Sequence, residues 1–441
     1  MKYIFLFICC LFIFNCTKEE VFYPPSLTDL SGSIKDIKNY GGSKNDVTKA
    51  VVKTFDGGAA ILGYTQSING DISDKSNENF DFWVIKLDSE NNLQWSKTFG
   101  GSGDDRGTDI IQTNDGGFSI TGYSTSSDKD VSGNAGSQDF WIVKLNENGI
   151  ISWNKTFGYT GADYSNTILQ SSDNGYLITG VLDVTASGGL GNSRYSQRHA
   201  GGDIWAIKLN ENGILQWSKY FGGSFTDASF GALETDDNNF IIVGSSDSSD
   251  IDISNSNGSY DFWLLKISEA GSLIWEKNLG GSEIDEARGV VKTTDGNFII
   301  VGDTRSADKN VSTNNGAADV WITKVSDQGN LIWEKTIGGA SFDVARSISK
   351  TQDNGFIISG SSRSLDNGFT NQGQNDALLI KITSEGELVW QKTIGGSEID
   401  FFYDAVQLND SSIIAVGETN SSNGDLTENK GFSDALIVKL K

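Results

Sequence analysis

Short runs of consecutive hydrophobic residues recur along most of this chain, separated by stretches rich in Gly, Asp, Asn and Ser. Residues 140–143 (Phe-Trp-Ile-Val), for example, are apolar at four successive positions. Apolar runs of about four to eight residues between turn residues are typical of strands that are covered on both faces. The pattern therefore predicts an all-β protein built from short, buried strands.

One stretch of about 60 residues shows the predicted elements most clearly. Gly in the tight turn 114–117 (Asn-Asp-Gly-Gly) supplies the positive φ that a hairpin needs, and a second turn lies at 146–149. A longer loop lies between these two hairpins. We expect four strands here, at residues 108–113, 118–122, 139–145 and 150–157.

The same stretch occurs seven times, so that successive copies lie 57 to 64 residues apart. A fixed period of this size indicates a repeat architecture, and four strands per repeat arranged radially give a β-propeller. We therefore predict a seven-bladed β-propeller. The Gly pairs or their equivalents that mark the copies begin at Gly41, Gly100, Gly158, Gly222, Gly280, Gly338 and Gly395.

The two ends of the repeat region indicate how the ring closes. The last copy stops after its third strand, at residues 434–441, and a strand that matches the missing fourth one lies at 33–40. Pairing these two segments would complete the last blade and remove both open edges. We expect the propeller to span residues 32–441; the alternative is an open solenoid.

Several residue types return in every copy, and we interpret them as structural because a catalytic group is needed only once. In the second copy they include Asp105 after the Gly pair, Asp115 in the first hairpin, Asp139 at the third strand and Lys144 five residues later. Short Asp side chains accept backbone N–H bonds in turns, and Lys offsets nearby carboxylates.

All eleven Trp residues lie in predicted third and fourth strands. Burial of each would stabilise the blades by about 2–3 kcal/mol. Pairing of these two strands predicts Lys97 opposite Trp83, in a cation–π contact. The alternative interpretation is a sugar-stacking surface, which would require the rings to be exposed.

Charge and composition exclude several classes of function. The net charge of −24 argues against binding to nucleic acid or to anionic lipid, because both would be repelled. The single histidine, His199, leaves no set of imidazoles for a multi-His site. All three Cys residues lie within the first 16 positions, so the predicted propeller has no disulfide. We expect a monomer.

The N-terminus reads as a targeting segment. A positive start and a short apolar stretch, residues 3–14, precede Cys16, which resembles a bacterial lipoprotein signal of residues 1–15 with lipidation of Cys16. The following residues 16–31 read as a tether. We expect an outer-membrane lipoprotein that faces the cell exterior, with the leaflet left open; the alternatives are a plain secretory signal or an uncleaved anchor.

The long loop between the second and third strands lies on the same predicted face as the Gly-Gly-Ser connections, and the tight turns lie on the other. Acidic residues alternate in two of these loops, at Asp128 and Asp130 and at Asp250 and Asp252. They are weak candidates for Ca²⁺ ligands, although the spacing is not that of an EF-hand. The alternative is that they order a polar loop. We expect no other cofactor.

The third copy has a longer loop than the others, with 23 residues from Gly180 to Asp203 against 16 to 18 elsewhere. This loop carries a basic and aromatic group, the candidate ligand-binding residues Arg194, Tyr195, Arg198 and His199. It is either a recognition loop for an anionic or glycan partner or a tolerated insertion.

The repeated segments W-x-K-T-x-G-G, D-G-G-F and D-x-W-x-x-K-L resemble those of secreted bacterial propeller lipoproteins, which are mostly uncharacterised and are sometimes labelled lectin-like. The resemblance covers residues 33–441 and implies the fold, but little about function, because propellers host many activities. The turn at 209–217 is also similar to the Trp-docking repeat of quinoprotein propellers. It is one residue shorter, and no cofactor site accompanies it.

These observations favour a non-catalytic, lipid-anchored, cell-surface propeller that binds an extracellular glycan or protein, with no catalytic residues assigned. One alternative is a polysaccharide lyase or hydrolase with its site at the mouth of the central channel. Another is a scaffold subunit of an envelope complex. An acid, base or nucleophile that is not repeated among the copies and lies at the channel mouth would favour the enzyme. The only non-repeated cluster that the sequence suggests is the loop of the third copy.

Overall fold

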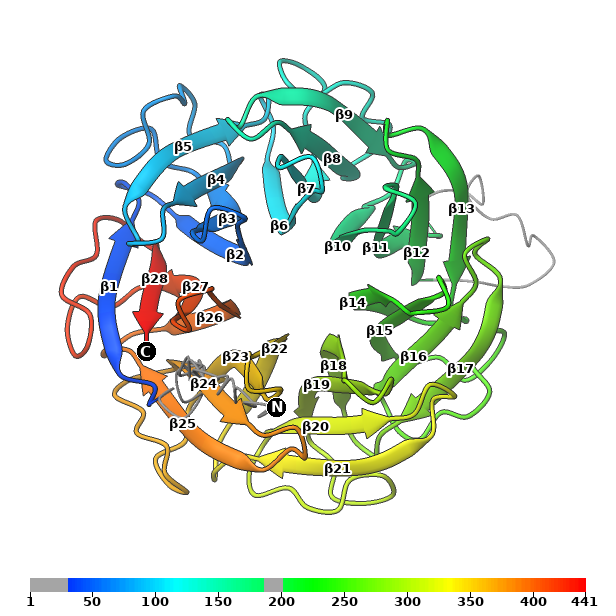
Figure 1. Ribbon diagram of the computed structural model, residues 1–441. Coiled ribbons are helices and arrows are strands. Elements are labelled where there is room, and N and C mark those ends of the chain that lie inside the picture. Colours follow the sequence, from blue (N-terminus) through cyan, green and yellow to red (C-terminus); the bar gives the residue numbers. More distant parts are fainter. Residues whose placement is uncertain (1–30, 186–200) are drawn as a thin grey trace, which may run out of the picture.

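The computed structural model describes residues 31–185 and 201–441 of the chain. In these residues it forms 28 strands in seven four-stranded antiparallel sheets, which stand around a central axis like the blades of a propeller (Figure 1). The predicted all-β fold with seven blades is confirmed. No helix in the described ranges is long and apolar enough to span a membrane.

Each of the first six blades consists of four strands that are consecutive in the chain. The first three blades contain β2 (Asp46–Lys53), β3 (Ala59–Thr65), β4 (Asp81–Leu87) and β5 (Leu93–Phe99), then β6 (Asp105–Gln112), β7 (Phe118–Ser124), β8 (Asp139–Leu145) and β9 (Ile151–Phe157), then β10 (Tyr164–Gln170), β11 (Tyr176–Asp183), β12 (Gly202–Leu209) and β13 (Leu215–Phe221). The next three contain β14 (Asp227–Glu234), β15 (Phe240–Ser246), β16 (Asp261–Ile267) and β17 (Leu273–Leu279), then β18 (Asp285–Lys292), β19 (Phe298–Thr304), β20 (Asp319–Val325) and β21 (Leu331–Ile337), then β22 (Asp343–Lys350), β23 (Phe356–Ser362), β24 (Asp376–Ile382) and β25 (Leu388–Ile394).

The seventh blade joins the two ends of the described chain. It consists of β26 (Asp400–Gln407), β27 (Ile413–Thr419) and β28 (Asp434–Leu440), and its outer strand is β1 (Ile34–Tyr40). β1 runs antiparallel to β28, and Ser33 and Lys441 exchange two backbone hydrogen bonds of 2.9 Å. The predicted closure is confirmed.

The first strand of the second blade begins earlier than predicted. In the second copy we expected it to begin at Thr108, whereas β6 begins at Asp105. Residues 105–107 pair with β7, and a β-bulge then leaves Thr108 without a partner in the register. Gly107 and the bulge hide the alternation on which a strand prediction depends.

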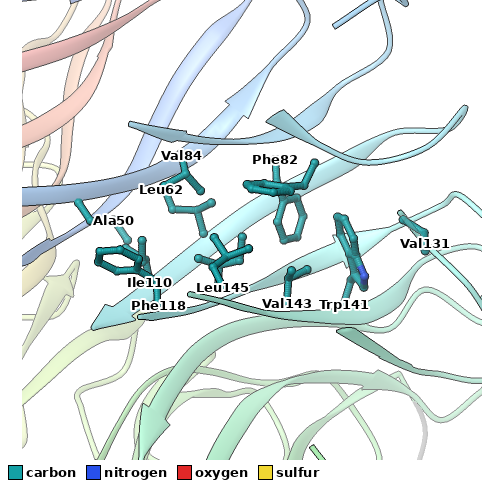
Figure 2. Packing of buried hydrophobic residues seen from close by; sticks show 13 residues of the cluster. Ala50, Leu62, Phe82, Val84, Ile110, Phe118, Val131, Trp141, Val143 and Leu145 are labelled. Carbon is teal, nitrogen blue, oxygen red and sulfur yellow. The ribbon is translucent and has the colours of Figure 1, made fainter. Parts of the chain in front are cut away.

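The hydrophobic core is divided among the gaps between blades. Seven clusters of buried residues occur in the described part of the chain, one for each pair of neighbouring blades. Figure 2 shows the cluster between the first two blades, where the rings of Phe82 and Trp141 are 4.6 Å apart. Both faces of a blade are therefore covered by its neighbours, which explains why the third strands are apolar at consecutive positions.

The pairing predicted between Lys97 and Trp83 is wrong. A bulge between Lys86 and Leu87 shifts the register of β4 and β5 by one residue, so Lys97 lies opposite Val84. The Lys97 ammonium instead lies 5.7 Å from the centroid of Trp95 on its own strand. It donates a hydrogen bond of 2.7 Å to the carbonyl of Asn148 in the next blade.

The Trp of each fourth strand packs against the turn between the third and fourth strands of the next blade. The Gly in that turn has a positive φ and lies so close to the ring that a Cβ on Gly213 would be 2.9 Å from Trp153. The pairs are Trp95–Gly149, Trp153–Gly213, Trp217–Gly271, Trp275–Gly329, Trp333–Gly386 and Trp390–Gly32. We call these contacts the Trp–Gly contacts.

One junction lacks a Trp–Gly contact and shows what replaces it. β1 carries Asp36 where the other fourth strands carry Trp, and the turn that faces it carries Asn91 in place of Gly. The Asn91 amide donates a hydrogen bond of 2.9 Å to the Asp36 carboxylate. Both partners have therefore changed together within the repeat, which supports a structural role for the contact.

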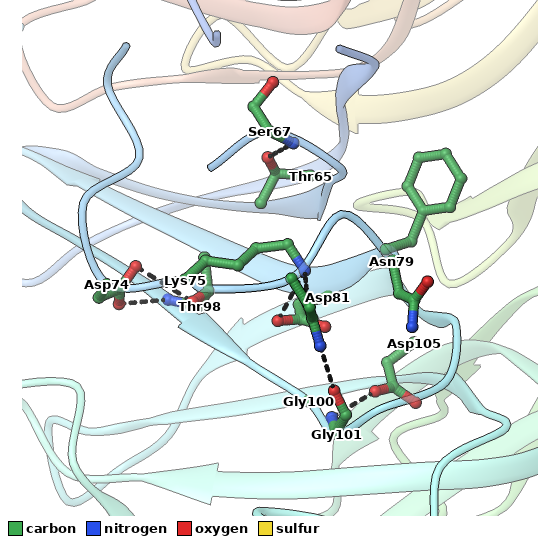
Figure 3. A network of polar contacts seen from close by, with 12 residues as sticks. Thr65, Ser67, Asp74, Lys75, Asn79, Asp81, Thr98, Gly100, Gly101 and Asp105 are labelled. Carbon is green, nitrogen blue, oxygen red and sulfur yellow. Dashed lines mark hydrogen bonds and ion pairs between the residues drawn. The ribbon is translucent and has the colours of Figure 1, made fainter. Parts of the chain in front are cut away.

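The repeated Asp residues bind backbone and hydroxyl groups at each junction between blades. Figure 3 shows the junction of the first two blades, where Asp105 accepts a hydrogen bond of 2.7 Å from the Gly101 N–H. Asp105 also accepts one of 2.8 Å from the Ser126 hydroxyl. Asp81, at the start of β4, forms an ion pair of 2.9 Å with Lys75. The prediction that these carboxylates are framework groups is confirmed.

Two carboxylates meet at each junction. Carboxylate oxygens of Asp81 and Asp105 both lie 2.7 Å from the point that a Cβ on Gly100 would occupy, so only Gly fits between them. Burial raises the pKa of many of these groups. It raises the pKa to about 7 for Asp227 and to about 6 for Asp81, Asp163, Asp319, Asp376 and Asp434.

The Asp of the first hairpin has a lowered pKa, because a Lys pairs with it in every blade. In the second blade the Lys144 ammonium lies 2.8 Å from Asp115, and the bonds from Lys144 and Thr113 outweigh the effect of partial burial and lower the pKa of Asp115. The other pairs are Lys86–Asp56, Lys208–Asp173, Lys266–Asp237, Lys324–Asp295, Lys381–Asp353 and Lys439–Asp410. The expected charge offset by Lys is confirmed.

We predict that Gly213→Ala destabilises the protein more than Gly116→Ala. Both Gly residues have positive φ, but an added Cβ at Gly116 meets nothing within 4 Å, whereas at Gly213 it meets Trp153. Gly116→Ala should lower the free energy of unfolding by about 1–2 kcal/mol through backbone strain alone. Gly213→Ala should cost at least about 1 kcal/mol more through overpacking. Denaturant unfolding of both variants measures the difference, and equal losses would refute the Trp–Gly contact as a stabilising element.

We also predict that the melting temperature rises as the pH falls from about 7.5 to about 5.5. A carboxyl group whose pKa is higher in the folded than in the unfolded protein binds its proton more tightly when folded, so the free energy of unfolding decreases as the pH rises through that range. Thermal melts at constant ionic strength measure this slope. Asp319→Asn, which removes one such group, should make it shallower; a melting temperature that rises with pH would contradict the assignment.

Candidate functional site

Every innermost strand carries a β-bulge at the same position, three residues after the repeated Asp. These strands, β2, β6, β10, β14, β18, β22 and β26, surround the central axis (Figure 1). Bulges reorient a side chain locally and are frequent beside active sites. The seven bulged residues, which we call the channel ring, are Lys49, Thr108, Asn166, Phe230, Arg288, Arg346 and Tyr403.

A central cavity of about 360 Å³ is lined by the channel ring and by the residues that follow it in each strand. This volume lies in the range of small-molecule binding pockets, about 300–1,000 Å³. Gly231 and Gly289 follow the bulges of two neighbouring blades and leave room there. The fold therefore places one set of non-repeated side chains around one central space.

Positive charge is concentrated on the innermost strands although the protein as a whole is acidic. Apart from the repeated Asp residues, the innermost strands hold seven basic and four acidic residues, whereas the whole chain has 34 basic and 58 acidic ones. Three of the basic residues, Lys49, Arg288 and Arg346, line the central cavity. The cavity is thus suited to an anion.

Lys49 extends over an aromatic ring. Its ammonium lies 3.3 Å from the centroid of Tyr403, and it makes no hydrogen bond or ion pair with the residues that the structure describes. Burial lowers the pKa of Lys49 to about 7, and Glu418 opposes this shift. The positive charges of Arg346 and Arg288 lower it further. Lys49 therefore exchanges between the ammonium and the neutral amine near neutral pH.

Arg288 and Arg346 occupy equivalent positions in the fifth and sixth blades. Arg288 forms an ion pair of 2.9 Å with Glu286 and stacks 4.2 Å from the centroid of Phe230. Arg346 makes no hydrogen bond or ion pair within the described ranges, and the buried Nε atoms of both Arg residues lack partners. Burial, followed by repulsion from Arg288, lowers the pKa of Arg346. Both residues line the central cavity.

The acidic residues beside the cavity are already engaged with protein groups. Asp109 accepts hydrogen bonds of 2.8 Å from the N–H groups of Ile110 and Ile168, and Asp404 accepts one of 2.9 Å from Val51. Burial raises the pKa of Asp109 to about 7 and also raises that of Asp404. These two carboxyl groups tie neighbouring blades together.

The Glu418 carboxylate fixes the position of Tyr403. Its hydroxyl donates a hydrogen bond of 2.5 Å to Glu418, which also accepts one of 2.9 Å from Ser433. Burial, followed by the nearby Glu418 charge, raises the pKa of Tyr403 well above its usual value. Tyr403 therefore stays protonated and holds a defined ring position beneath Lys49.

The lipidation and ligand-binding residues predicted from sequence lie outside the described part of the chain. They are Cys16 and the loop residues Arg194, Tyr195, Arg198 and His199, so those assignments remain predictions. The cluster that the sequence analysis missed is the channel ring, which is the kind of non-repeated set of groups we expected an enzyme to need.

A signal for the channel ring was present in the aligned copies. Three residues after the repeated Asp, the seven copies carry six different residue types, whereas the flanking strand positions are mostly small or apolar. A position that varies inside a buried strand indicates that its side chain faces a space rather than a neighbouring blade. Attention to the invariant positions hid this signal.

The candidate calcium ligands hold loop backbone instead. Asp128 accepts a hydrogen bond of 2.7 Å from the Ser102 N–H, and Asp250 accepts one of 2.9 Å from Ser224. Asp130 and Asp252 accept longer ones, of 3.2 Å, from the Gly pairs of the same junctions. No group of three or more acidic, His or Cys side chains that could hold a metal occurs in the described ranges. These bonds also confirm that the long loops share one face with the Gly-Gly-Ser connections.

The Trp residues offer little free ring surface for stacking a sugar. Third-strand rings such as Trp83 and Trp141 are buried between blades. Fourth-strand rings are half-buried, with one side against the Gly of the next blade. Lys97 and Lys335 lie 5.7 and 5.6 Å from the rings of Trp95 and Trp333. The arrangement favours the structural interpretation.

Comparisons with known proteins identify the fold and nothing finer. No protein-family model and no curated relative matches the chain. Among solved structures, it is similar to a fungal alcohol oxidase of the AA5 family in complex with copper (9% identity, 93% of this chain and 76% of that chain, TM-score 0.51). It is also similar to a protein of unknown function from Bacteroides caccae (11% identity, 71% and 90%, TM-score 0.42) and to a gluconolactonase from Xanthomonas campestris (8%, 93% and 100%, TM-score 0.38).

We predict that Asp250→Asn leaves stability unchanged with or without calcium. Asn69 already occupies the equivalent position in the first blade, where its side chain accepts a hydrogen bond of 2.9 Å from the Ser43 N–H. Asp250→Ala, in contrast, should cost about 1–2 kcal/mol, because the Ser224 N–H loses its acceptor. Thermal melts in Ca²⁺ and in EDTA test this. Stabilisation of the natural protein by Ca²⁺ that Asp250→Asn abolishes would instead establish a calcium site.

Proposed function

We propose that this chain is a non-catalytic binding protein whose central channel takes a carboxylate-bearing sugar unit of an extracellular acidic glycan. The observation that carries the proposal is the group of three cations, Lys49, Arg288 and Arg346, around one cavity in a protein of net charge −24. Such a local reversal of charge is unfavourable for folding, so an anionic ligand is its simplest explanation.

The chemistry of these cations fits a carboxylate. The planar guanidinium of Arg pairs with carboxylates through two parallel hydrogen bonds, and such charge-assisted bonds are stronger than neutral ones. Arg346 and Arg288 keep unpartnered Nε donors beside the cavity. A bound carboxylate would give Arg346 an ion-pair partner, which it lacks among the described residues.

The remaining lining fits a sugar ring better than a small inorganic anion. Phe230 offers an apolar surface, and Thr108 and Asn166 offer hydroxyl and amide groups at the same level of the channel. Outside the cavity, Arg305 and Arg363 lie within 6 Å of the Phe342 ring, at the loop-bearing ends of the blades that carry Arg288 and Arg346. A glycan longer than one unit would meet these further cations.

The predicted signal segment would place this site outside the cell. Lipidation of Cys16, followed by the tether to residue 31, would leave the propeller anchored to the outer membrane and free to meet soluble polysaccharide.

A polysaccharide lyase is the second candidate, and Lys49 favours it. Cations that neutralise a uronate carboxylate make the neighbouring C–H more acidic, and an amine with a pKa of about 7 is suited to remove that proton. If a bound uronate polymer is released as an unsaturated product, the protein is a lyase and not a non-catalytic binding protein.

We predict that the protein binds an oligogalacturonate and not a neutral oligosaccharide of equal length. Isothermal titration measures both. The variant Arg288→Met/Arg346→Met should weaken binding by roughly tenfold or more, because it removes both guanidinium partners of the carboxylate. Binding should also weaken as salt concentration rises.

The matched control for charge is Lys155→Met/Lys219→Met, which removes two cations from exposed positions on outer strands. It should bind like the natural protein, and thermal melts should show that both double variants are folded. Whole cells that carry Cys16→Ser should lose surface binding. Equal binding of neutral and acidic oligosaccharides, or equal weakening by the two double variants, would refute the proposal.

A further inference from the structure

Lys49 is partly buried and differs in its partners from the repeated lysines of the third strands. The repeated third-strand lysines each pair with a hairpin carboxylate, as Lys144 does with Asp115 at 2.8 Å. Among the described residues, the Lys49 ammonium contacts only the ring of Tyr403, at 3.3 Å, and Lys49 lines the central cavity. A framework role of the kind that Lys144 has therefore does not explain it.

We propose that Lys49 is a nucleophile that forms an imine with a 2-keto acid whose carboxylate is held by Arg288 and Arg346. This inference rests on the proposed function, because the same two guanidinium groups would hold the ligand carboxylate. It goes further by naming the class of ligand, a carboxylate next to a carbonyl, and a covalent step at one atom, Nζ of Lys49.

The surroundings of Lys49 favour a reactive amine. A lysine becomes nucleophilic when it is desolvated or lies near other cations, because both effects disfavour the ammonium form. Both conditions hold here: the side chain is partly buried over the Tyr403 ring, and Arg106, Arg288 and Arg346 add positive charge around it. Glu418, the opposing charge, is already engaged by the Tyr403 hydroxyl at 2.5 Å.

The reaction needs no oxidant, reductant or cofactor. The lone pair of the neutral Lys49 amine forms a bond to the ketone carbon, while the C=O π electrons move to the oxygen, which takes up a proton. The resulting carbinolamine loses that oxygen as water and the nitrogen loses its proton. Amine and ketone thus give imine and one water molecule.

The two guanidinium groups, Arg288 and Arg346, favour a 2-keto acid over other carbonyl compounds. In such a compound the carboxylate and the electrophilic carbon are adjacent, so guanidinium groups that fix the first also position the second beside Lys49. A neutral aldehyde has no anchor in the cavity and should react no better there than at surface lysines. Acidic sugars that are 2-keto acids in their open-chain form combine this chemistry with the proposed glycan site.

The test is reductive trapping on the full protein. The protein is incubated with pyruvate and sodium cyanoborohydride, and adducts are counted by intact mass and located by peptide mapping. We expect one adduct per chain, on Lys49, which Lys49→Arg abolishes while keeping the positive charge. Arg288→Met/Arg346→Met should slow trapping at least tenfold, whereas acetaldehyde should label many surface lysines without preference for Lys49.

Modification spread over surface lysines with pyruvate, or one adduct that survives in Lys49→Arg, would overturn the imine. Thermal melts of each variant show that loss of trapping does not come from loss of the fold. The oligogalacturonate titration separates the two proposals. Uronate binding without trapping would support the binding site and refute the imine. Trapping without uronate binding would support imine formation at Lys49 and refute the glycan as the ligand.

Discussion

The need to cover both faces of every blade is the constraint on which this structure depends. Each sheet has apolar side chains on its two sides, so a blade at an open end would expose one whole face to water. Closure of the ring removes that exposure, and the chain achieves it by pairing β1 with β28 from opposite ends. Gly32, just before β1, lies against Trp390 and supplies the contact that a third-to-fourth-strand turn supplies elsewhere.

This framework is repeated because each junction between blades poses the same problem. Trp–Gly contacts, paired carboxylates and Lys–Asp ion pairs recur with the same geometry, so they stabilise the ring and carry no information about a ligand. The channel ring has the opposite property. Its side chains line the axial cavity, outside the packed gaps between blades, and the copies have diverged to Lys49, Arg288, Tyr403 and their counterparts.

Sequence reasoning predicted those features that depend on local periodicity. The blade number, the closure by residues 33–40 and the Lys144–Asp115 type of ion pair follow from the repeat and from turn chemistry. It failed where one extra residue changes a register. The bulge after Lys86 moved Lys97 away from Trp83, and the bulges at the channel ring hid the innermost strand positions that face the cavity.

The candidate site was out of reach for a further reason. Lys49, Arg288 and Arg346 are separated by more than 50 residues along the chain, and each is unremarkable in its own strand. Only the circular arrangement of blades brings the first next to the fifth and sixth across one axis. Charge that is scattered in sequence but gathered in space becomes visible only in the folded chain.

The central claim is that repeated residues build the ring and non-repeated residues in its channel bind the ligand. A crystal structure of the protein with a bound oligogalacturonate tests this most directly. The account predicts density for a sugar in the central cavity, with its carboxylate between Arg288 and Arg346 and next to Lys49. Sugar density against the outer Trp residues or the loop of the third blade, with the cavity unchanged, would contradict it.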